Sequence, residues 1–445
     1  MYHDLTKGGI AKSLLLFSLP MTAGNLLQQL YNIADTLIVG RALGRDALAA
    51  VGSAYTLMTF LTSVFIGLAM GSGALFSIYI GKDDREKLKD SVWQSFVLIF
   101  AVTAAINTAV YIFIDPILRF LKVPDELYSD MREYLVIIFA GIAVTFLYNF
   151  LACLIRAAGD SVSPLIFLGV SAVINIGLDL LFVLVFDYGI AGAAAATVIS
   201  QYISGIGMLI FTLAKRPELI PERKHIRLDR KTLGEICDLS ILTSAQQSAM
   251  NFGILLVQRL VDSFGPVVMA AFAASVKIDS FAYLPVQDFG NAFSTFAAQN
   301  YGAGKKERIR QGIRQSVISV ILFCIVISCG VFVLAQPLMQ LFVSETSREI
   351  IAVGVQYLRI EGACYVGIGI LFMLYGYYRA VNRPNMSVVL TVISLGTRVL
   401  LSYTLSKISW LGVTGIWVSI PIGWFLADAV GILVYLRSRR LDEKG

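Results

Sequence analysis

Long apolar segments recur along the whole chain, and they constrain the fold more than any other feature of the sequence. A segment of about 20 mainly apolar residues is long enough to cross the hydrocarbon core of a bilayer as a helix. Only 15% of the 445 residues are charged, against about 25% in soluble domains. We therefore predict an all-α polytopic membrane protein with about twelve transmembrane helices, at 14–40, 49–80, 91–114, 131–157, 163–186, 190–213, 237–262, 268–300, 314–341, 351–378, 386–406 and 412–436.

The polar segment 215–236 lies between two halves of six predicted spans each. It predicts an N-lobe over 1–214, a cytoplasmic linker over 215–236 and a C-lobe over 237–445. The halves resemble each other at an offset of 221 residues, where Gly81 matches Gly302 and the pair Gln94–Ser95 matches Gln315–Ser316. Six spans are an even number, so the two repeats are parallel and related by a pseudo-two-fold axis along the membrane normal. Such proteins bind substrate between their lobes and work by alternating access.

Lysine and arginine concentrate in alternate polar segments, which indicates the orientation of the chain. The segments 81–90, 215–236 and 303–314 are rich in these residues, and all three lie on the same side as the N-terminus. By the positive-inside rule, both termini are expected in the cytoplasm of a multi-pass protein of the plasma or inner membrane. The positive charge is spread over short loops, so it does not predict nucleic-acid binding.

A polar stripe lies on one face of the first span. Asn25, Gln28, Asn32 and Asp35 follow one another at steps of three or four residues, so a helix presents them together. A carboxylate at the bilayer centre costs roughly 2.5–3.5 kcal/mol on insertion scales. The stripe is therefore expected to face protein or a water-filled cavity, as in an ion or substrate pathway. Pro20 predicts a bend earlier in the same helix.

The fifth span carries a second intramembrane carboxylate, Asp179, with Ser171 and Asn175 on the same face. Measured from the preceding basic residue, Asp35 and Asp179 lie equally far along spans that run in the same direction. Thr197 in the sixth span lies at a comparable depth. Two carboxyl groups at one depth either exchange protons or hold a small cation such as Na⁺, with Asn and Thr oxygens completing the shell. The alternative is a pair of buried acids that only join helices.

The second half is not expected to repeat this acidic pair. Leu256 stands where the repeat places Asp35, and no acid lies near Ser402, the counterpart of Asp179. The seventh span instead offers neutral polar residues and Met, which suit bulky ligands but also serve hydrogen bonds between helices. Candidate substrate contacts in the two halves are Gln28, Tyr31, Asn32, Gln246, Gln247, Met250, Asn251 and Asp288.

Three further positions carry expectations without a settled role. Pro285, close to Asp288, is expected to interrupt the eighth span. Glu361 in the tenth span is either structural or functional, and Arg398 in the eleventh is a possible counter-ion for Asp35 or Asp179. Gly67 and Gly71 are expected to permit close packing of helices.

Enzymatic readings find no support in the sequence. The two histidines, His3 and His225, lie in polar segments, and no HExxH, GxSxG, Walker A or Cys/His cluster occurs in the chain. The five cysteines are read as small core residues rather than as a metal or disulfide framework. We expect no cofactor other than the transported ion.

With these residues the chain resembles the multidrug and toxic compound extrusion (MATE) family of the MOP flippase superfamily, and within it the DinF-like and MepA-like bacterial branch. The resemblance covers essentially the whole chain. Its signature is Pro20 followed by Asp35 in the first helix, Asn175 and Asp179 in the fifth, and Thr197 in the sixth. It implies a cation-coupling set of Asp35, Asp179, Asn175, Thr197 and a fourth-helix asparagine, Asn149.

The resemblance implies a monomeric antiporter that exports organic cations or aromatic drugs in exchange for H⁺ or Na⁺. Another branch of the family binds cations at acids in the seventh and tenth helices, where this chain has Gln and Gly apart from Glu361, which lies too early to match. This departure favours a coupling site in the N-lobe. The alternatives are a flippase or exporter of lipid-linked saccharides or endogenous metabolites, and a membrane scaffold or receptor without transport.

Overall fold

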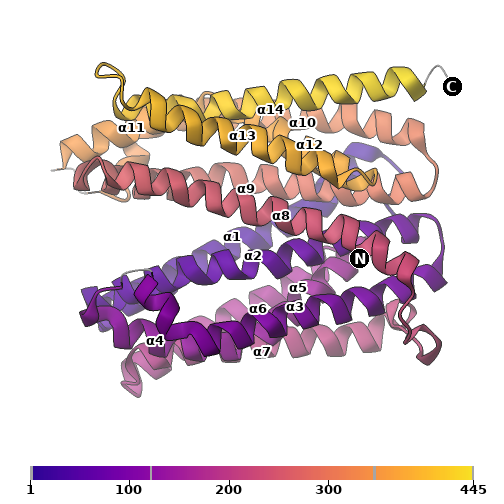
Figure 1. Cartoon of the computed structure of the whole chain (residues 1–445), viewed down its shortest axis with the longest axis horizontal. Coiled ribbons are helices and arrows are strands. Elements are labelled where there is room, and N and C mark those ends of the chain that lie inside the picture. Colours follow the sequence, from indigo (N-terminus) through magenta and orange to yellow (C-terminus); the bar gives the residue numbers. More distant parts are fainter. Residues whose placement is uncertain (1–3, 121–122, 344–346, 443–445) are drawn as a thin grey trace. The chain divides into compact units, whose positions relative to one another are not determined.

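The computed structural model describes residues 4–120, 123–343 and 347–442, and no strand occurs in these ranges. Helices run alongside one another through each half of the chain (Figure 1). The first half contains α1 (Ile10–Ala42), α2 (Arg45–Gly81), α3 (Arg85–Phe120), α4 (Asp125–Ala140), α5 (Ile142–Ala157), α6 (Val162–Asp179), the π-helix η1 (Leu180–Val185) and α7 (Gly189–Lys215). The second half contains α8 (Arg230–Asp262), α9 (Pro266–Gly302), α10 (Lys306–Gln340), α11 (Arg348–Gly362), α12 (Tyr365–Ala380), α13 (Pro384–Leu405) and α14 (Val413–Asp442).

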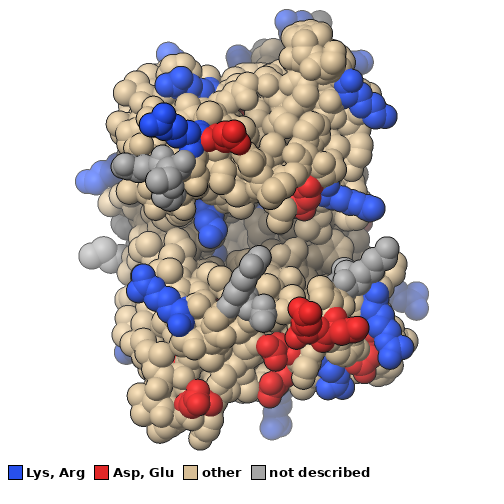
Figure 2. Space-filling model, turned by 90° about the vertical axis from the view of Figure 1, so that its left-hand side faces the viewer, with Lys and Arg blue, Asp and Glu red and all other residues tan. Residues whose placement is uncertain are grey.

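Nine spans within the described ranges are long and apolar enough to cross a membrane, and two bent pairs, α4–α5 and α11–α12, bring the number to eleven. The helix α8 has the required length, 33 residues, and is the polar seventh span of the sequence analysis. The predicted all-α polytopic class is confirmed. One end of the molecule carries charged side chains in small groups among neutral residues (Figure 2), as expected for helix ends and loops that leave the hydrocarbon region.

The structure differs from the expected spans in where helices break. The spans expected at 131–157 and 351–378 are each two helices, with bends of 48° and 52°. The first bend lies at Gly141, where an added Cβ would come within 2.9 Å of the Gln201 side chain. The interruption expected near Pro285 is wrong, because α9 continues through this residue. The α1 helix also contains Pro20, and the bend expected there stays a prediction. Transmembrane helices tolerate proline where neighbouring groups satisfy the freed carbonyl.

The chain forms two compact units. Unit 1 contains Leu19–Ser244, and unit 2 contains Leu5–Ser18 together with the chain from Ala245 onward. The helices α1 and α8 therefore each begin in one unit and continue in the other. Residues 230–244 of α8 belong to unit 1; the sequence analysis assigned 230–236 to the linker and 237–244 to the C-lobe.

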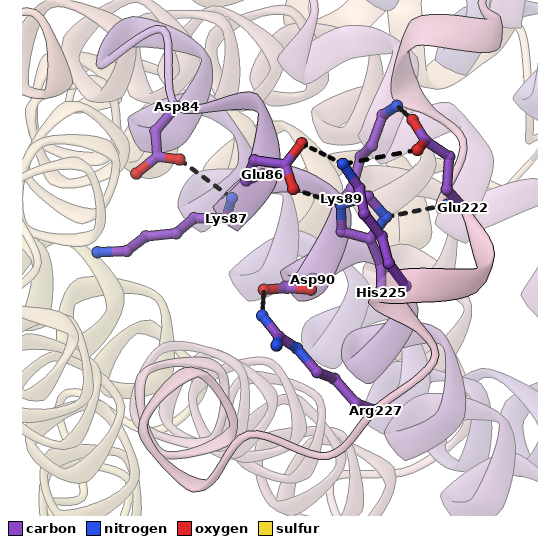
Figure 3. Close-up of polar contacts among 9 residues, drawn as sticks. Asp84, Glu86, Lys87, Lys89, Asp90, Glu222, His225 and Arg227 are labelled. Atoms are coloured by element: carbon purple, nitrogen blue, oxygen red, sulfur yellow. Dashed lines mark hydrogen bonds and ion pairs between the residues drawn. The ribbon is translucent and has the colours of Figure 1, made fainter.

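In unit 1, the linker is held against the start of α3 by a group of ion pairs and hydrogen bonds (Figure 3). Glu86 of α3 accepts hydrogen bonds from Lys224 at 2.8 Å and from His225 Nε2 at 3.2 Å. The nearby Lys224 ammonium holds the pKa of Glu86 below its usual value. Arg227 pairs with Asp90 of the same helix at 3.2 Å. These contacts fix the approach of the chain to α8.

Unit 2 anchors the start of α1 in an equivalent way. Arg308, in the first turn of α10, donates hydrogen bonds to the carbonyl groups of Leu5, Lys7 and Gly8. Asn300 near the end of α9 also donates to Leu5 at 3.2 Å. At the repeat offset of 221, residues 5–8 correspond to 226–229 of the linker. The segments that lead into α1 and α8 are thus both held by residues at equivalent positions of the two repeats.

Candidate functional site

The candidate site in unit 1 centres on two carboxyl groups, those of Asp35 on α1 and Asp179 at the end of α6. The two side chains interact directly. Asp179 is fully buried. Among the residues that the structure describes, no donor lies at hydrogen-bond distance from either Asp179 oxygen or from Oδ1 of Asp35. The immediate polar neighbour of each acid is therefore the other acid.

This arrangement is unfavourable when both groups are ionised. Two carboxylates in contact repel each other, and the low dielectric of a helix bundle strengthens the repulsion. Within the described ranges, no lysine or arginine forms an ion pair with either carboxyl group. One shared proton or one bound cation removes the repulsion. The described lysines and arginines do not supply this positive charge.

Asn175 and Thr197 are joined by a hydrogen bond between α6 and α7. Asn175 is one helical turn before Asp179, and its Nδ2 donates to Thr197 Oγ1 on α7 at 3.4 Å. The Asn175 Oδ1 atom is buried and lacks a hydrogen-bond donor among the described residues. One turn earlier, Ser171 donates to the Ser200 carbonyl group on α7 at 2.9 Å. The polar face of α6 therefore packs against α7 and leaves an amide oxygen free near the carboxyl groups.

The helix changes its geometry directly after Asp179. Residues 180–185 form the π-helix η1. Such segments are rare and often occur at functional sites, because they change the direction of the side chains and carbonyl groups around them. The sequence carried no signal for this segment, since Leu180–Val185 reads as an ordinary apolar stretch.

Three tyrosines complete the site, and the sequence analysis named only one of them. Tyr31 on α1 is hydrogen-bonded to Gln28 and lies in the field of both carboxyl groups. Tyr134 on α4 is 4% exposed and interacts electrostatically with Asp35, Asp179 and Tyr31. Tyr55 on α2 lies beside these two tyrosines. The internal repeat could have indicated Tyr134, because the residue 223 positions later, Tyr357, is also a tyrosine.

The remaining predicted residues of unit 1, Asn149 and Asn32, form hydrogen bonds within their own helices. Asn149 on α5 donates from Nδ2 to the Thr145 carbonyl group of its own helix at 2.8 Å. Asn32 on α1 is partly exposed, and its carbonyl group accepts a hydrogen bond from Thr36 at 2.7 Å. Gln28 is connected to the carboxyl pair indirectly, because it is hydrogen-bonded to Tyr31, which interacts with both acids.

The predicted substrate contacts of unit 2 have different degrees of burial. Gln246 on α8 is buried, whereas Gln247, Met250 and Asn251 are partly exposed. Asp288 on α9 is only 1% exposed. Its carboxyl group is therefore enclosed within the protein.

The structure corrects one expectation about the second half, which does contain an acidic pair. Asp279 on α9 and Glu361 on α11 interact directly, and Arg398 on α13 lies beside them. Arg398 therefore lies beside two acids of its own unit. It does not act as the counter-ion of Asp35 or Asp179 that was considered for it. The pair escaped sequence analysis because its acids lie on helices that do not correspond to α1 and α6 in the repeat. Neither the spacing of residues along one helix nor the repeat offset connects Asp279 with Glu361.

Two repeated helical halves with carboxyl pairs inside membrane-length helices are typical of membrane transporters. The chain belongs to the MatE family, whose family model matches residues 20–181 and 240–404. Members of this family are secondary transporters and not enzymes. The predicted resemblance to MATE transporters is confirmed.

Individual relatives match over nearly the whole chain. Probable multidrug resistance protein YpnP of Bacillus subtilis (strain 168) is 32% identical over 98% of this chain and 97% of its own length. Probable multidrug resistance protein YoeA of the same organism is 28% identical, with coverage of 96% and 93%. An outward-facing multidrug resistance MATE transporter of the MOP superfamily has the same fold, with a TM-score of 0.91, 22% identity and coverage of 98% and 97%.

Proposed function

We propose that this protein is a cation-coupled antiporter that exports organic cations and aromatic drugs in exchange for H⁺ or Na⁺. The observation that carries the proposal is the contact between Asp35 and Asp179, which lacks an ion-pair partner among the described lysines and arginines. Intramembrane carboxyl groups of this kind are the usual binding groups for coupling ions. The names of YpnP and YoeA, both probable multidrug resistance proteins, support drugs as the exported compounds.

The coupling step follows from the charge of the pair. A cation that enters from outside bridges Asp35 and Asp179, reduces their repulsion and allows their two helices to approach. The Asn175 amide oxygen and the Thr197 hydroxyl group supply further oxygen ligands when the ion is Na⁺. Because α1 carries both Asp35 and Pro20, loading of the pair is expected to change the bend of α1. Substrate and coupling ion then weaken each other's binding by equal factors, as linkage requires.

The substrate class follows from the side chains around the pair. Tyr31, Tyr55 and Tyr134 are phenol rings beside acidic groups, a combination that attracts an organic cation through both charge and cation–π contact. Gln28 and Asn32 on α1 offer hydrogen bonds from the same helix face. In unit 2, the partly exposed Gln247, Met250 and Asn251 are proposed to contribute adaptable contacts. Both termini are proposed to lie in the cytoplasm.

The test is efflux of a fluorescent organic cation from proteoliposomes, with Na⁺ and proton gradients imposed separately. One gradient is expected to drive efflux by the wild type, and Asp35→Asn is expected to abolish this efflux. Asp187→Asn, in the exposed loop before α7, is the matched control and should retain it. If Asp35→Asn retained full coupled efflux, the carboxyl pair would not be the coupling site.

The same experiment separates the rival functions. If neither gradient drives efflux of organic cations, the next ligands to test are lipid-linked saccharides and endogenous metabolites. A scaffold or receptor would bind ligand without any flux in either gradient. The acidic character of the unit 1 site argues against an anionic pyrophosphate substrate there, because two carboxyl groups would repel it.

A further inference from the structure

We infer that unit 2 contains a second proton-binding site, formed by Asp279 and Glu361 and balanced by Arg398. This site lies outside the proposed coupling pair of unit 1, and the inference does not depend on which ion that pair binds. It concerns a cluster of five side chains in unit 2: Asp279 on α9, Tyr357 and Glu361 on α11, Tyr365 on α12 and Arg398 on α13.

The contacts within this cluster place two acids next to each other. The Tyr365 hydroxyl group donates to Asp279 Oδ1. Glu361 interacts directly with Asp279 and is hydrogen-bonded to Tyr357. The Glu361 Oε1 atom is buried and has no donor among the described residues. An acceptor oxygen that is enclosed beside a second carboxyl group is satisfied when one of the two groups carries a proton.

The net charge of the cluster indicates how many protons the two carboxyl groups hold. Two ionised carboxyl groups and one guanidinium group leave one negative charge in the cluster. One proton on the pair makes the cluster neutral, and a second would leave the guanidinium charge unbalanced. An uncompensated charge in an apolar interior is more costly than a neutral hydrogen-bonded acid. The pair is therefore expected to hold one proton, which the two carboxyl groups share.

The neighbours favour a proton over a metal ion. Arg398 is a cation beside both acids, and a second full cation such as Na⁺ at the pair would be repelled by it. The tyrosine hydroxyl groups already occupy carboxyl oxygens as donors, so these oxygens are not free to form a coordination shell. Among the described residues, no group of three or more His, Cys, Asp or Glu side chains could hold a metal ion.

The surroundings keep water away from the pair. Asp279, Glu361, Tyr357 and Tyr365 are between 2% and 8% exposed. Tyr357 packs edge-on against Trp417 of α14 with ring centroids 5.0 Å apart. The other titratable groups that face the cluster are two thiols, Cys364 beside Glu361 and Cys324 of α10 beside Tyr365. The enclosed position favours retention of the proton within the protein.

The repeat explains why this cluster is not a copy of the unit 1 site. Tyr357 and Arg398 stand 223 positions after Tyr134 and Asn175, so the same two helix positions contribute to each cluster. The acids differ, since α9 and α11 supply them in unit 2. An arginine in place of Asn175 brings a fixed positive charge. The unit 1 pair has no such fixed charge beside it, whereas in unit 2 Arg398 and one proton together balance the two acids.

The test is infrared spectroscopy of the purified full-length protein at pH 7, in the carbonyl-stretch region of protonated carboxyl groups. All variants are made in an Asp35→Asn/Asp179→Asn background, which removes the signal of unit 1 and makes the result independent of transport. We expect Glu361→Gln and Asp279→Asn each to remove the same single band. One band lost in either variant is the signature of one shared proton, because the remaining acid then ionises beside Arg398.

A third variant gives a change in the opposite direction that misfolding cannot imitate. Arg398→Gln removes the balancing charge, so we expect a second protonated-carboxyl band to appear. Addition of Na⁺ at constant pH is expected to leave the band of the Asp35→Asn/Asp179→Asn background unchanged. The inference would be overturned if both acid variants retained the full band, if Arg398→Gln added none, or if Na⁺ removed the band.

Discussion

Asp35 and Asp179 bring their carboxyl groups into direct contact from helices α1 and α6, although 144 residues separate them in the chain. Both acids lie in helices that cross the membrane, where an unbalanced charge is costly. Their contact has no hydrogen-bond donor at Asp179 among the described side chains. A structural role alone would be served better by one acid with a donor, so the contact points to a group that binds and releases a cation.

The first prediction concerns Asp179→Asn. The amide can donate a hydrogen bond to Asp35 and removes the repulsion, so the folded protein is expected to be at least as stable as the wild type. Gradient-driven efflux is expected to fall by about 5- to 150-fold, the usual range for loss of a coupling free energy. Proteoliposome flux and a thermal unfolding curve measure the two effects. Loss of efflux together with a much lower melting temperature would instead indicate a structural role.

The sequence predicted much of this site for a simple reason. Asn175 and Asp179 share one face of a single helix, so their spacing was enough to predict a common polar surface. The contact between Asp35 and Asp179 was suggested by equal depth alone, because two parallel spans of known direction place residues at comparable heights. Most of the spans were readable because they are apolar segments of membrane length.

The parts that the sequence did not reveal depend on contacts between helices. Asp279 and Glu361 meet because α9 and α11 pack together, and no local pattern records that packing. At the bend near Gly141, a side chain would press against Gln201 and Val198 of α7, two residues that no local pattern links to this glycine. The π-helix after Asp179 has an ordinary apolar sequence. Pro285 misled the prediction, since the packed surroundings allow α9 to continue through it.

The second prediction concerns Asp160, in the turn between α5 and α6 outside the membrane spans. Burial opposes its charged form, but hydrogen bonds from the Ser163 backbone and hydroxyl group, with that of Arg216, hold the pKa of Asp160 below its usual value. A lowered pKa stabilises the fold above the ordinary value of about 3.9, and this contribution is lost as pH falls through the folded-state pKa. Asp160→Ala is expected to destabilise the protein by about 0.5–2 kcal/mol at neutral pH.

Thermal unfolding between pH 3 and pH 7 measures this effect. The difference between Asp160→Ala and the wild type should shrink toward the acidic end of the range. Asp187→Ala, at an exposed loop position, is the control and should show no such trend. A difference that stays constant over the whole range would contradict the assignment.

The third prediction concerns the contacts that hold the linker to α3 (Figure 3). His225 is 1% exposed, and its Nδ1 accepts a hydrogen bond from the Glu222 backbone at 3.1 Å. The ring therefore carries its proton on Nε2, which donates to Glu86. His225→Ala removes both bonds and leaves a cavity. Cleavage of the 215–236 segment by trypsin is expected to become faster in this variant.

The matched control for the linker is Arg223→Gln, which removes a nearby charge but none of these bonds. Its trypsin cleavage, followed by mass spectrometry of the fragments, should keep the wild-type rate at the other linker sites. Equal cleavage rates for His225→Ala and the wild type would show that the buried imidazole does not secure the linker.

The last prediction concerns Gly71, where α2 touches the first part of α8 within unit 1. A Cβ at Gly71 would lie 2.5 Å from the Ser240 Cα and 2.6 Å from the Leu239 carbonyl oxygen. Both are backbone atoms, so the helices must separate to admit a side chain. The expected close packing at this glycine is therefore observed, and overpacking of this kind destabilises by typically about 1–3 kcal/mol.

Gly52 on the same helix provides a matched control, because a Cβ there meets no atom within 4 Å. Gly52→Ala is expected to leave stability unchanged or to raise it by about 0.5–1 kcal/mol through helix propensity. Gly71→Ala should unfold at a lower temperature in the same detergent, and separation of α2 from α8 would also weaken the Ser72–Ser240 hydrogen bond of 2.9 Å. If the two alanine variants unfolded at the same temperature, the α2–α8 contact would be loose enough to accept a methyl group, and glycine would not be required there.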